Sequence, residues 1–482
     1  MHVLTPQTVC LAGAARRDIT PPVGIYHRMW GAATHDRSTG VHRPLTCTAL
    51  ALAPHDSQGH QLDQTEVLVS IDHCLMWNDD LERLVATICR GTRLRPNQLQ
   101  IALTHTHAAG LLDSTRSDLP GGDLIGPYLE QLANQAAEAV SEALGKLSLA
   151  TIVYGAGRCS LAAHRDFWDE DSRQFVCGFN PAADADDTLT VARVTRPSGE
   201  ILATIVNYAC HPTTLAWDNT LISPDYVGAL RETVEAATGG APCVFLQGAS
   251  GDLGPRRGFV GDVEVADRNG REVGHAALAA LEALAPAGTA FEYAGPVISG
   301  ATIGTWRDRP LAEAEQSQAR AWQSRMVDVP LPYRDDLPSR ELSEEEMAHW
   351  IRIEAQALEQ GNHDAARDAR AQIERMARQL RRLRLLPAGD AVPVRASLWR
   401  LGGALWVFVA GEHYQFLQRT LRARFPGLSI LVSTVTNGWL PGYLPTQETY
   451  GRGIYQESIA IVARGSLEQL TEAIAAELET LV

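Results

Sequence analysis

The sequence predicts an α/β fold, in which a mixed β-sheet core is covered by helices and interrupted by a helical hairpin insertion. Short apolar runs at residues 67–72, 101–107, 204–211 and 243–250 predict strands. Longer segments with helical spacing of apolar residues, such as 128–147, follow several of them. This alternation is typical of α/β units, whose sheets are covered by the connecting helices.

The second observation is a change in composition between residues 310 and 385, which are rich in Ala, Glu, Arg and Gln. Such residues favour helices, and the strand pattern resumes after Pro387. We therefore expect one domain formed by residues 1–309 and 386–482, with residues 310–385 as a helical insertion.

Signals inside the insertion refine this prediction. Ser343 and Glu346 have the spacing of a capping box that starts a helix, and residues 361–364 predict a break between two helices. The basic run Arg378–Arg384 is interpreted as the solvated face of a helix. Apolar residues at helical spacing are expected to pack on a neighbouring surface: Trp350, Ile353 and Leu358.

Composition excludes several classes of function. The formal net charge of −15 argues against a nucleic-acid or anionic-membrane partner. No stretch is apolar for the roughly 18 residues that a membrane helix needs, and the N-terminus lacks a secretory pattern, so we expect a cytoplasmic protein. The eight cysteines are scattered without a C-x-x-C pair, so we expect buried thiols rather than disulfides or a thiolate metal site. A homo-oligomer stays open.

His105 and His107 are the first candidates for chemistry. They stand two residues apart in LTHTHAAG, directly after an apolar run. On a strand, both imidazoles would project from one face, where they could supply two metal ligands, or one ligand and a polar neighbour. Two surface histidines that enter a loop are the alternative. His211 ends another apolar run, in ACHP, and open α/β sheets collect functional groups at such strand ends.

Weaker signals lie further along the chain. A Gly-rich turn at residues 246–256 could approach a site closely, and Glu412 follows an apolar strand. The loop at residues 437–458 carries tyrosines that are individually typical of packing residues: Tyr443, Tyr450 and Tyr455.

The order of these motifs is more informative than any one of them. DITPPVG, LTHTHAAG, NYACHP, ISPDYVGALR, QGASGDLGP, GE and NGWLPGYLPT together resemble the neutral/alkaline non-lysosomal ceramidase-like family, in its N-terminal catalytic domain. The resemblance covers nearly all of the chain outside the insertion. It implies a zinc-dependent hydrolase that cleaves an amide or ester bond.

The resemblance also implies roles for particular residues. It assigns the zinc ligands to His105, His211, Glu412 and Tyr443. The spacing alone leaves open whether His105 or His107 binds the metal. The resemblance also implies three residues that act on the substrate. His107 is expected to transfer a proton, and Arg165 and Tyr455 are expected to stabilise charge on the carbonyl oxygen.

Three departures from the family pattern shape the expected substrate. Gly254 stands where ceramidases carry a serine, no signal peptide is evident, and the chain ends without a C-terminal β-sandwich. We therefore expect a small or medium-sized soluble amide or ester to be a better substrate than long-chain ceramide.

Alternative functions stay open. An amidohydrolase-type barrel also begins with H-x-H on a strand, but the further strand-end ligands that it needs are missing. A serine hydrolase could use Ser250, although GASGD departs from the nucleophile elbow G-x-S-x-G. A catalytically silent metal-binding or scaffold protein would require a lost ligand, and all four are present. We expect the insertion to cover the mouth of the site, with a remote hairpin or a dimer contact as the alternatives.

Overall fold

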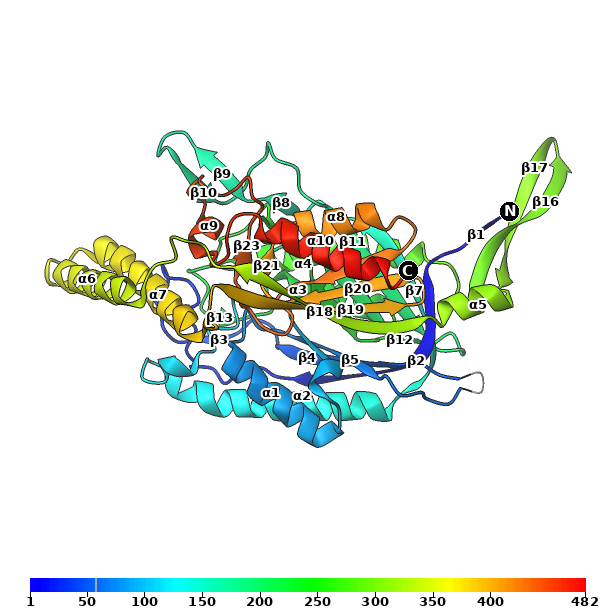
Figure 1. Cartoon of the computed structure of the whole chain (residues 1–482), viewed down its shortest axis with the longest axis horizontal. Helices are drawn as coiled ribbons and strands as arrows, with labels where there is room; N and C mark the ends of the chain where they lie inside the picture. The colour runs from blue at the N-terminus through cyan, green and yellow to red at the C-terminus, as the bar shows by residue number, and fades with distance from the viewer. Residues whose placement is uncertain (57–58) are drawn as a thin grey trace.

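In the computed structural model, which describes residues 1–56 and 59–482, an eight-stranded mixed sheet forms the centre of the molecule (Figure 1). The order of its strands is β14-β12-β11-β7-β2-β4-β5-β6. Their bounds are β2 Gln7–Asp18, β4 Thr46–Ala53, β5 Glu66–Ile71, β6 Leu99–Leu103, β7 Ser148–Arg158, β11 Thr188–Thr195, β12 Ile201–Tyr208 and β14 Cys243–Gln247.

A second, four-stranded sheet packs against this one. Its order is β18 (Trp322–Pro332), β19 (Ala391–Leu401), β20 (Ala404–Val409) and β22 (Ser429–Ser433). The period-two alternation of strands explains the packing. On β4, Leu50 and Leu52 belong to the core cluster between the sheets, which includes Trp406 and Phe408, whereas Ala49 belongs to the core under the helices.

Helices cover both sheets, which gives four layers (Figure 1). The outer face of the large sheet carries α1 (Asn78–Thr92), α2 (Ile125–Gly145), α3 (Tyr226–Ala237) and α4 (Val263–Glu282). The small sheet carries α8 (Phe416–Arg424) and α10 (Ser466–Glu479). The predicted α/β fold with a mixed sheet covered by helices is confirmed. Because most neighbouring strands of the large sheet are antiparallel, the chain is not a parallel (β/α) barrel.

Two hairpins project from opposite ends of the molecule (Figure 1). One is β16 (Thr289–Ser299) with β17 (Ala301–Pro310), and the other is α6 (Arg340–Glu359) with α7 (His363–Leu385). Shorter elements connect the layers: β1 His2–Val3, β3 Gly40–Val41, β8 Ala162–His164, β9 Asp166–Asp169, β10 Gln174–Cys177, β13 Leu221–Ile222, β15 Leu253–Pro255, α5 Glu313–Ala319, β21 Glu412–His413, β23 Tyr443–Leu444, α9 Tyr455–Ile459, and 3-10 turns at Pro96–Gln98, Ser114–Arg116 and Gly122–Leu124. None of the helices in the described residues is long and apolar enough to cross a membrane.

The prediction of helices throughout residues 310–385 is wrong for residues 322–332. These residues form β18, which pairs antiparallel with β19 along its whole length. Val327, Val329 and Leu331 alternate with more polar residues, and this period-two pattern outweighs the helix-favouring composition around it. The paired helices are therefore confined to residues 340–385, and the predicted break at 361–364 falls between them.

The predicted start of α6 is also displaced. Ser339, not Ser343, caps the helix, since its Oγ accepts a hydrogen bond from the Leu342 N–H at 3.2 Å. Ser343 is buried inside the hairpin, where its Oγ accepts a hydrogen bond from Gln379 Nε2 at 2.7 Å. Leu358 is 55% exposed, so the apolar stripe does not pack on one surface as predicted.

The interpretation of the basic run as a solvated helix face is wrong as well. Arg381 and Arg382 are both buried at the base of the hairpin. Arg381 Nη2 donates to Asp79 Oδ2 at 2.6 Å, which ties α7 to α1. One face of the run therefore packs against the body of the protein.

Cysteine burial largely follows the prediction. Of the eight thiols, all free in the described structure, six are buried, while Cys89 and Cys177 are partly exposed.

The strands position a site because their carboxyl ends converge. β5 and β6 are parallel, β12 and β14 are parallel, and β20 and β22 are parallel. The large sheet curls enough for Ser70 Oγ of β5 to donate to the Phe245 carbonyl of β14 at 2.8 Å. Segments that are far apart in the sequence therefore meet where these strands end.

A buried ion pair holds this convergence together. Asp72 follows β5, accepts hydrogen bonds from both Nη atoms of Arg231 at 2.8 and 2.6 Å, and accepts one from Thr104 Oγ1 at 3.1 Å. Burial alone raises the pKa of Asp72, but the Arg231 charge and the hydrogen bonds outweigh it and lower the pKa.

Replacing this carboxylate is expected to be costly. Asp72→Asn leaves Arg231 buried without a compensating charge, so we expect a loss of about 3–5 kcal/mol in the free energy of unfolding. Asp328→Asn, in the exposed pair with Arg395, is the control and is expected to cost less than about 1 kcal/mol. Urea unfolding measures both. Equal losses in the two variants would contradict the anchoring role of Asp72.

Candidate metal and catalytic site

Four side chains from separate strand ends meet at one point. His105 follows β6, His211 follows β12, and Glu412 begins β21 just after β20. Tyr443 begins β23 and pairs in register with Glu412, so the two residues lie side by side. All four are buried.

The predicted strand geometry of the H-x-H pair is wrong. β6 ends at Leu103, and His105 adopts a left-handed φ of 69°, which is uncommon for a residue with a side chain. This turn, rather than strand alternation, directs the imidazole. The rings of His105 and His107 nevertheless lie 5.0 Å apart.

The donor atoms of His105, His211 and Glu412 form a tight triangle. The two Nε2 atoms are 3.0 Å apart, and Glu412 Oε2 lies 3.2 Å from Nε2 of His105 and 3.1 Å from Nε2 of His211. Ligands about 2 Å from a tetrahedral zinc ion are separated by about 3.3 Å. The triangle has the size of one face of such a coordination sphere.

Hydrogen bonds fix which imidazole nitrogens face the other donors. His105 Nδ1 donates to the Cys74 carbonyl at 2.6 Å, and His211 Nδ1 donates to the Ser250 carbonyl at 3.0 Å. Backbone carbonyls orient metal-binding histidines in this way. Burial, with Arg165 and His105 nearby, lowers the pKa of His211 to about 3, so this ring is neutral. Burial acts to lower the pKa of His105, but Cys74 and Glu412 outweigh it and raise the pKa well above its usual value. Two Nε2 atoms and a carboxylate oxygen therefore converge, and a bound cation would take the place of the His105 proton.

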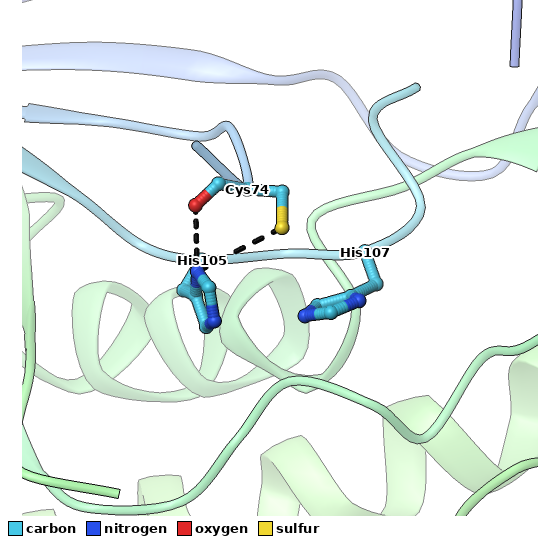
Figure 2. Close-up of side chains that lie close together, drawn as sticks. All are labelled: Cys74, His105 and His107. Atoms are coloured by element: carbon cyan, nitrogen blue, oxygen red, sulfur yellow. Dashed lines mark hydrogen bonds between the residues drawn. The ribbon is translucent and has the colours of Figure 1, made fainter. Parts of the chain in front are cut away.

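Figure 2 shows a second possible group around the same histidine, formed by Cys74, His105 and His107. His105 Nδ1 lies 3.7 Å from Cys74 Sγ but only 2.6 Å from the Cys74 carbonyl oxygen, to which it donates. Because that nitrogen carries a proton, Cys74 orients the His105 ring through its carbonyl and does not share a metal ion with it. Sequence reasoning missed this role, because nothing in the pattern distinguishes Cys74 from the other buried cysteines.

His107 lies beside the triangle rather than in it. Its ring is 5.5 Å from the His211 ring and 5.2 Å from the Trp30 ring. Burial, together with the neighbouring imidazoles of His105 and His211, lowers the pKa of His107 well below its usual value. Its Nε2 is buried and makes no hydrogen bond to any described residue. A neutral imidazole with a free nitrogen next to a metal site is suited to accept and deliver a proton.

Arg165 joins Tyr443 to the turn after β14. Arg165 Nη2 donates to the Gly251 carbonyl at 2.6 Å and to Tyr443 Oη at 3.0 Å. Tyr443 Oη lies 3.4 Å from His211 Nε2, on the edge of the triangle. The guanidinium therefore fixes the position of the phenol oxygen beside the other donors.

Tyr455 and Trp439 complete the surroundings. Tyr455 is the first residue of α9, is 48% exposed, and has its ring 5.9 Å from that of Tyr443. Trp439 Nε1 donates to Glu412 Oε1 at 2.6 Å, which leaves Oε2 for the triangle. The sequence signal for Trp439 was its position in NGWLPG, beside Tyr443. The structure brings together all seven predicted site residues, with Tyr455 at the accessible edge.

The geometry disfavours Ser250 as a nucleophile. Its Oγ accepts a hydrogen bond from Gln247 Nε2 at 2.6 Å and lies 3.4 Å from His211 Nδ1. That nitrogen carries the proton donated to the Ser250 carbonyl, so it is not a base for the hydroxyl.

The position of Gly254 can accept the serine that ceramidases carry. A Cβ atom there would meet Thr213 Oγ1 at 3.8 Å and Arg165 Cδ at 3.9 Å, which are ordinary contacts. We expect Gly254→Ser to lower the free energy of unfolding by no more than about 1 kcal/mol. Gly251→Ser is the control, because its Cβ would lie 2.7 Å from the Glu412 carbonyl oxygen. Thermal unfolding compares the two, and similar losses would show that residue 254 is closed to a side chain.

Comparisons with known proteins agree with this architecture. The family model for "Neutral/alkaline non-lysosomal ceramidase, N-terminal" matches residues 10–258, more than half of the chain. The structure is similar to that of a neutral ceramidase from Pseudomonas aeruginosa, with a TM-score of 0.61 and 14% identity over 98% of this chain and 73% of that chain. A ceramidase complexed with C2 gives a TM-score of 0.59 and 14% identity over 98% of this chain and 74% of that one. No curated protein sequence matches the chain.

Proposed function

Because the chain belongs to the neutral/alkaline non-lysosomal ceramidase family, we propose that it is a zinc-dependent hydrolase that cleaves the amide bond of an N-acylated substrate. The observation that carries the proposal is the buried triangle of two imidazole nitrogens and one carboxylate oxygen. Zinc suits this set, since it accepts nitrogen and oxygen donors in tetrahedral sites.

His105, His211 and Glu412 would hold the ion, with Tyr443 as a fourth donor. Zinc supplies a coordinated water of lowered pKa and polarises a carbonyl oxygen. Cys74 and Ser250 keep the ligand histidines in the tautomer that presents Nε2, through the hydrogen bonds to their carbonyls.

The remaining residues act on the substrate. His107 is neutral and has an unoccupied Nε2, which supports its role in carrying a proton to the leaving nitrogen. Arg165, buried and positively charged, and the phenol of Tyr455 would stabilise negative charge that develops on the carbonyl oxygen.

An aromatic cluster next to His107 supports a substrate with an apolar part. The Trp30 ring lies 6.1 Å from that of Trp217 and 5.7 Å from that of Phe259, and Trp217 is 36% exposed. Such rings bind acyl chains through apolar contact.

Chelation offers a direct test. The purified full-length protein would be assayed against long-chain ceramide, shorter N-acyl amides and the corresponding esters, before and after treatment with a chelator, and after zinc is restored. We expect amide hydrolysis that the chelator abolishes and zinc recovers, with shorter amides preferred over ceramide. Amide hydrolysis that survives complete metal removal would refute the proposal.

A further inference from the structure

Arg382 of α7 is a buried cation without a counterion. The residue is only 4% exposed, its Nε is buried without a hydrogen-bond partner, and it forms no ion pair with any residue that the structure describes. Its guanidinium carbon lies 6.0 Å from the centre of the Trp439 ring, in a cation–π interaction. Buried charges are almost always paired, because desolvation without a partner is costly.

Three carboxylates around the base of this helix are paired with other arginines. Asp79 lies 2.6 Å from Arg381, and Glu374 lies 2.6 Å from Arg116. Asp336 pairs with Arg334. The neighbouring Arg381, on the same helix and equally buried, shows what a structural arginine looks like here.

The charged side chains that lower the pKa of Arg382 are other arginines. Burial lowers the pKa of Arg382 to about 10, Tyr455 acts against this change, and Arg375 and Arg334 add to it. Arg378, one turn earlier on α7, donates to the Met29 carbonyl and forms no ion pair among residues 1–56 and 59–482. This part of α7 therefore presents excess positive charge.

This charge lies next to the candidate catalytic site. Trp439 stands between the Arg382 guanidinium and Glu412, to which its Nε1 donates at 2.6 Å. Tyr455, which interacts electrostatically with both Arg378 and Arg382, is half exposed beside Tyr443. One side chain, Trp439, therefore links the Arg382 guanidinium to the metal-binding triangle.

We propose that Arg382, with Arg378 beside it, binds a carboxylate of the substrate, so that the hydrolysed amide is anionic. This inference rests on the proposed amide hydrolase function of the neighbouring site. The planar guanidinium matches a carboxylate in shape, and the ligand supplies the countercharge that the fold omits.

Binding can be measured without any reaction. Decanoate and decanol share a chain length and contain no amide or ester, so neither is turned over. By calorimetry on the whole chain, we expect decanoate to bind at least about tenfold more tightly than decanol, a margin of about 1.4 kcal/mol in binding free energy. Arg382→Met should abolish this margin. Arg384→Met, an exposed arginine on the same helix, is the charge-matched control and should preserve it.

Two results would overturn the proposal. One is equal affinity for the two compounds in the unaltered protein. The other is an undiminished margin in Arg382→Met, which would mean that the carboxylate binds a metal ion or another arginine.

Matched amides extend the test to turnover. In the first pair, N-decanoylglycine and N-decanoylglycinamide, the carboxylate lies on the amine side of the amide bond. In the second pair, glutaric acid mono-octylamide and N-octylpentanamide, it lies on the acyl side. We expect kcat/KM to favour the anionic member of one pair at least tenfold, through KM, and Arg382→Met to remove the preference. No charge preference in either pair contradicts the inference but leaves amide hydrolysis intact. Selective decanoate binding without any hydrolysis contradicts the proposed function instead.

Stability separates a ligand-binding arginine from a structural one. Removing an uncompensated buried charge relieves a desolvation cost, so Arg382→Met should keep or raise the melting temperature of the ligand-free protein. Arg381→Met should lower it, because Asp79 and Asp113 lose their partner. A melting temperature that falls equally in both variants would assign Arg382 a structural role and overturn the proposal.

Discussion

Replacing His211 by alanine is expected to strip the metal from the protein and to abolish amide hydrolysis. The change removes one corner of the triangle and one of only two imidazole ligands, so a carboxylate, one imidazole and a phenol are left to hold the ion. Loss of a supporting residue around a metal costs about 10–100-fold in affinity, so loss of a ligand should cost more than ~100-fold. Elemental analysis after dialysis measures the outcome.

A matched control accompanies this variant. His164→Ala removes a partly exposed histidine on β8 that belongs neither to the triangle nor to the groups assigned to catalysis. It should retain zinc and fold normally by circular dichroism. A His211→Ala protein that keeps its full zinc content would show that the ligand assignment is wrong.

Replacing His107 by phenylalanine is expected to leave the metal in place and to lower kcat by about 10²–10⁴-fold, the range of general acid–base catalysis. Phenylalanine keeps an aromatic ring beside Trp30, so packing is preserved while the free Nε2 is lost. The measurement is kcat on the best amide, with zinc content determined on the same preparation. Unchanged kcat with zinc bound would exclude His107 from proton transfer, whereas loss of zinc would make it a ligand.

The sequence was sufficient to predict where the site residues lie along the chain. Apolar runs predicted β6, β12 and β20, and polar side chains at their carboxyl ends marked the positions that parallel strands bring together. The assignment of His105, His211, Glu412 and Tyr443 to one set of metal ligands came from the family resemblance. The choice between His105 and His107 depends on a left-handed backbone at residue 105 and on the carbonyl of Cys74, and neither is visible in the spacing.

The base of the helical hairpin was beyond sequence reasoning for a different reason. α7 carries apolar residues at helical spacing, such as Ile373, Met376 and Leu380. Arg381 and Arg382 are charged, so this periodicity does not mark them as buried. Arg381 and Arg382 are adjacent in sequence and each lies over a tryptophan ring, yet only Arg381 pairs with carboxylates. Only the tertiary packing of α7 against the body of the protein distinguishes them. The expectation that the insertion shapes the mouth of the site stays a prediction, supported by the contact between Arg382 and Trp439.

Anomalous scattering at the zinc absorption edge, recorded from crystals of the protein as purified, tests the central claim most directly. The account predicts about one zinc ion per chain, as a single peak within bonding distance of Nε2 of His105, Nε2 of His211 and Oε2 of Glu412. A peak between Cys74 and His107, or the absence of any peak at the triangle in protein that hydrolyses amides, would contradict it.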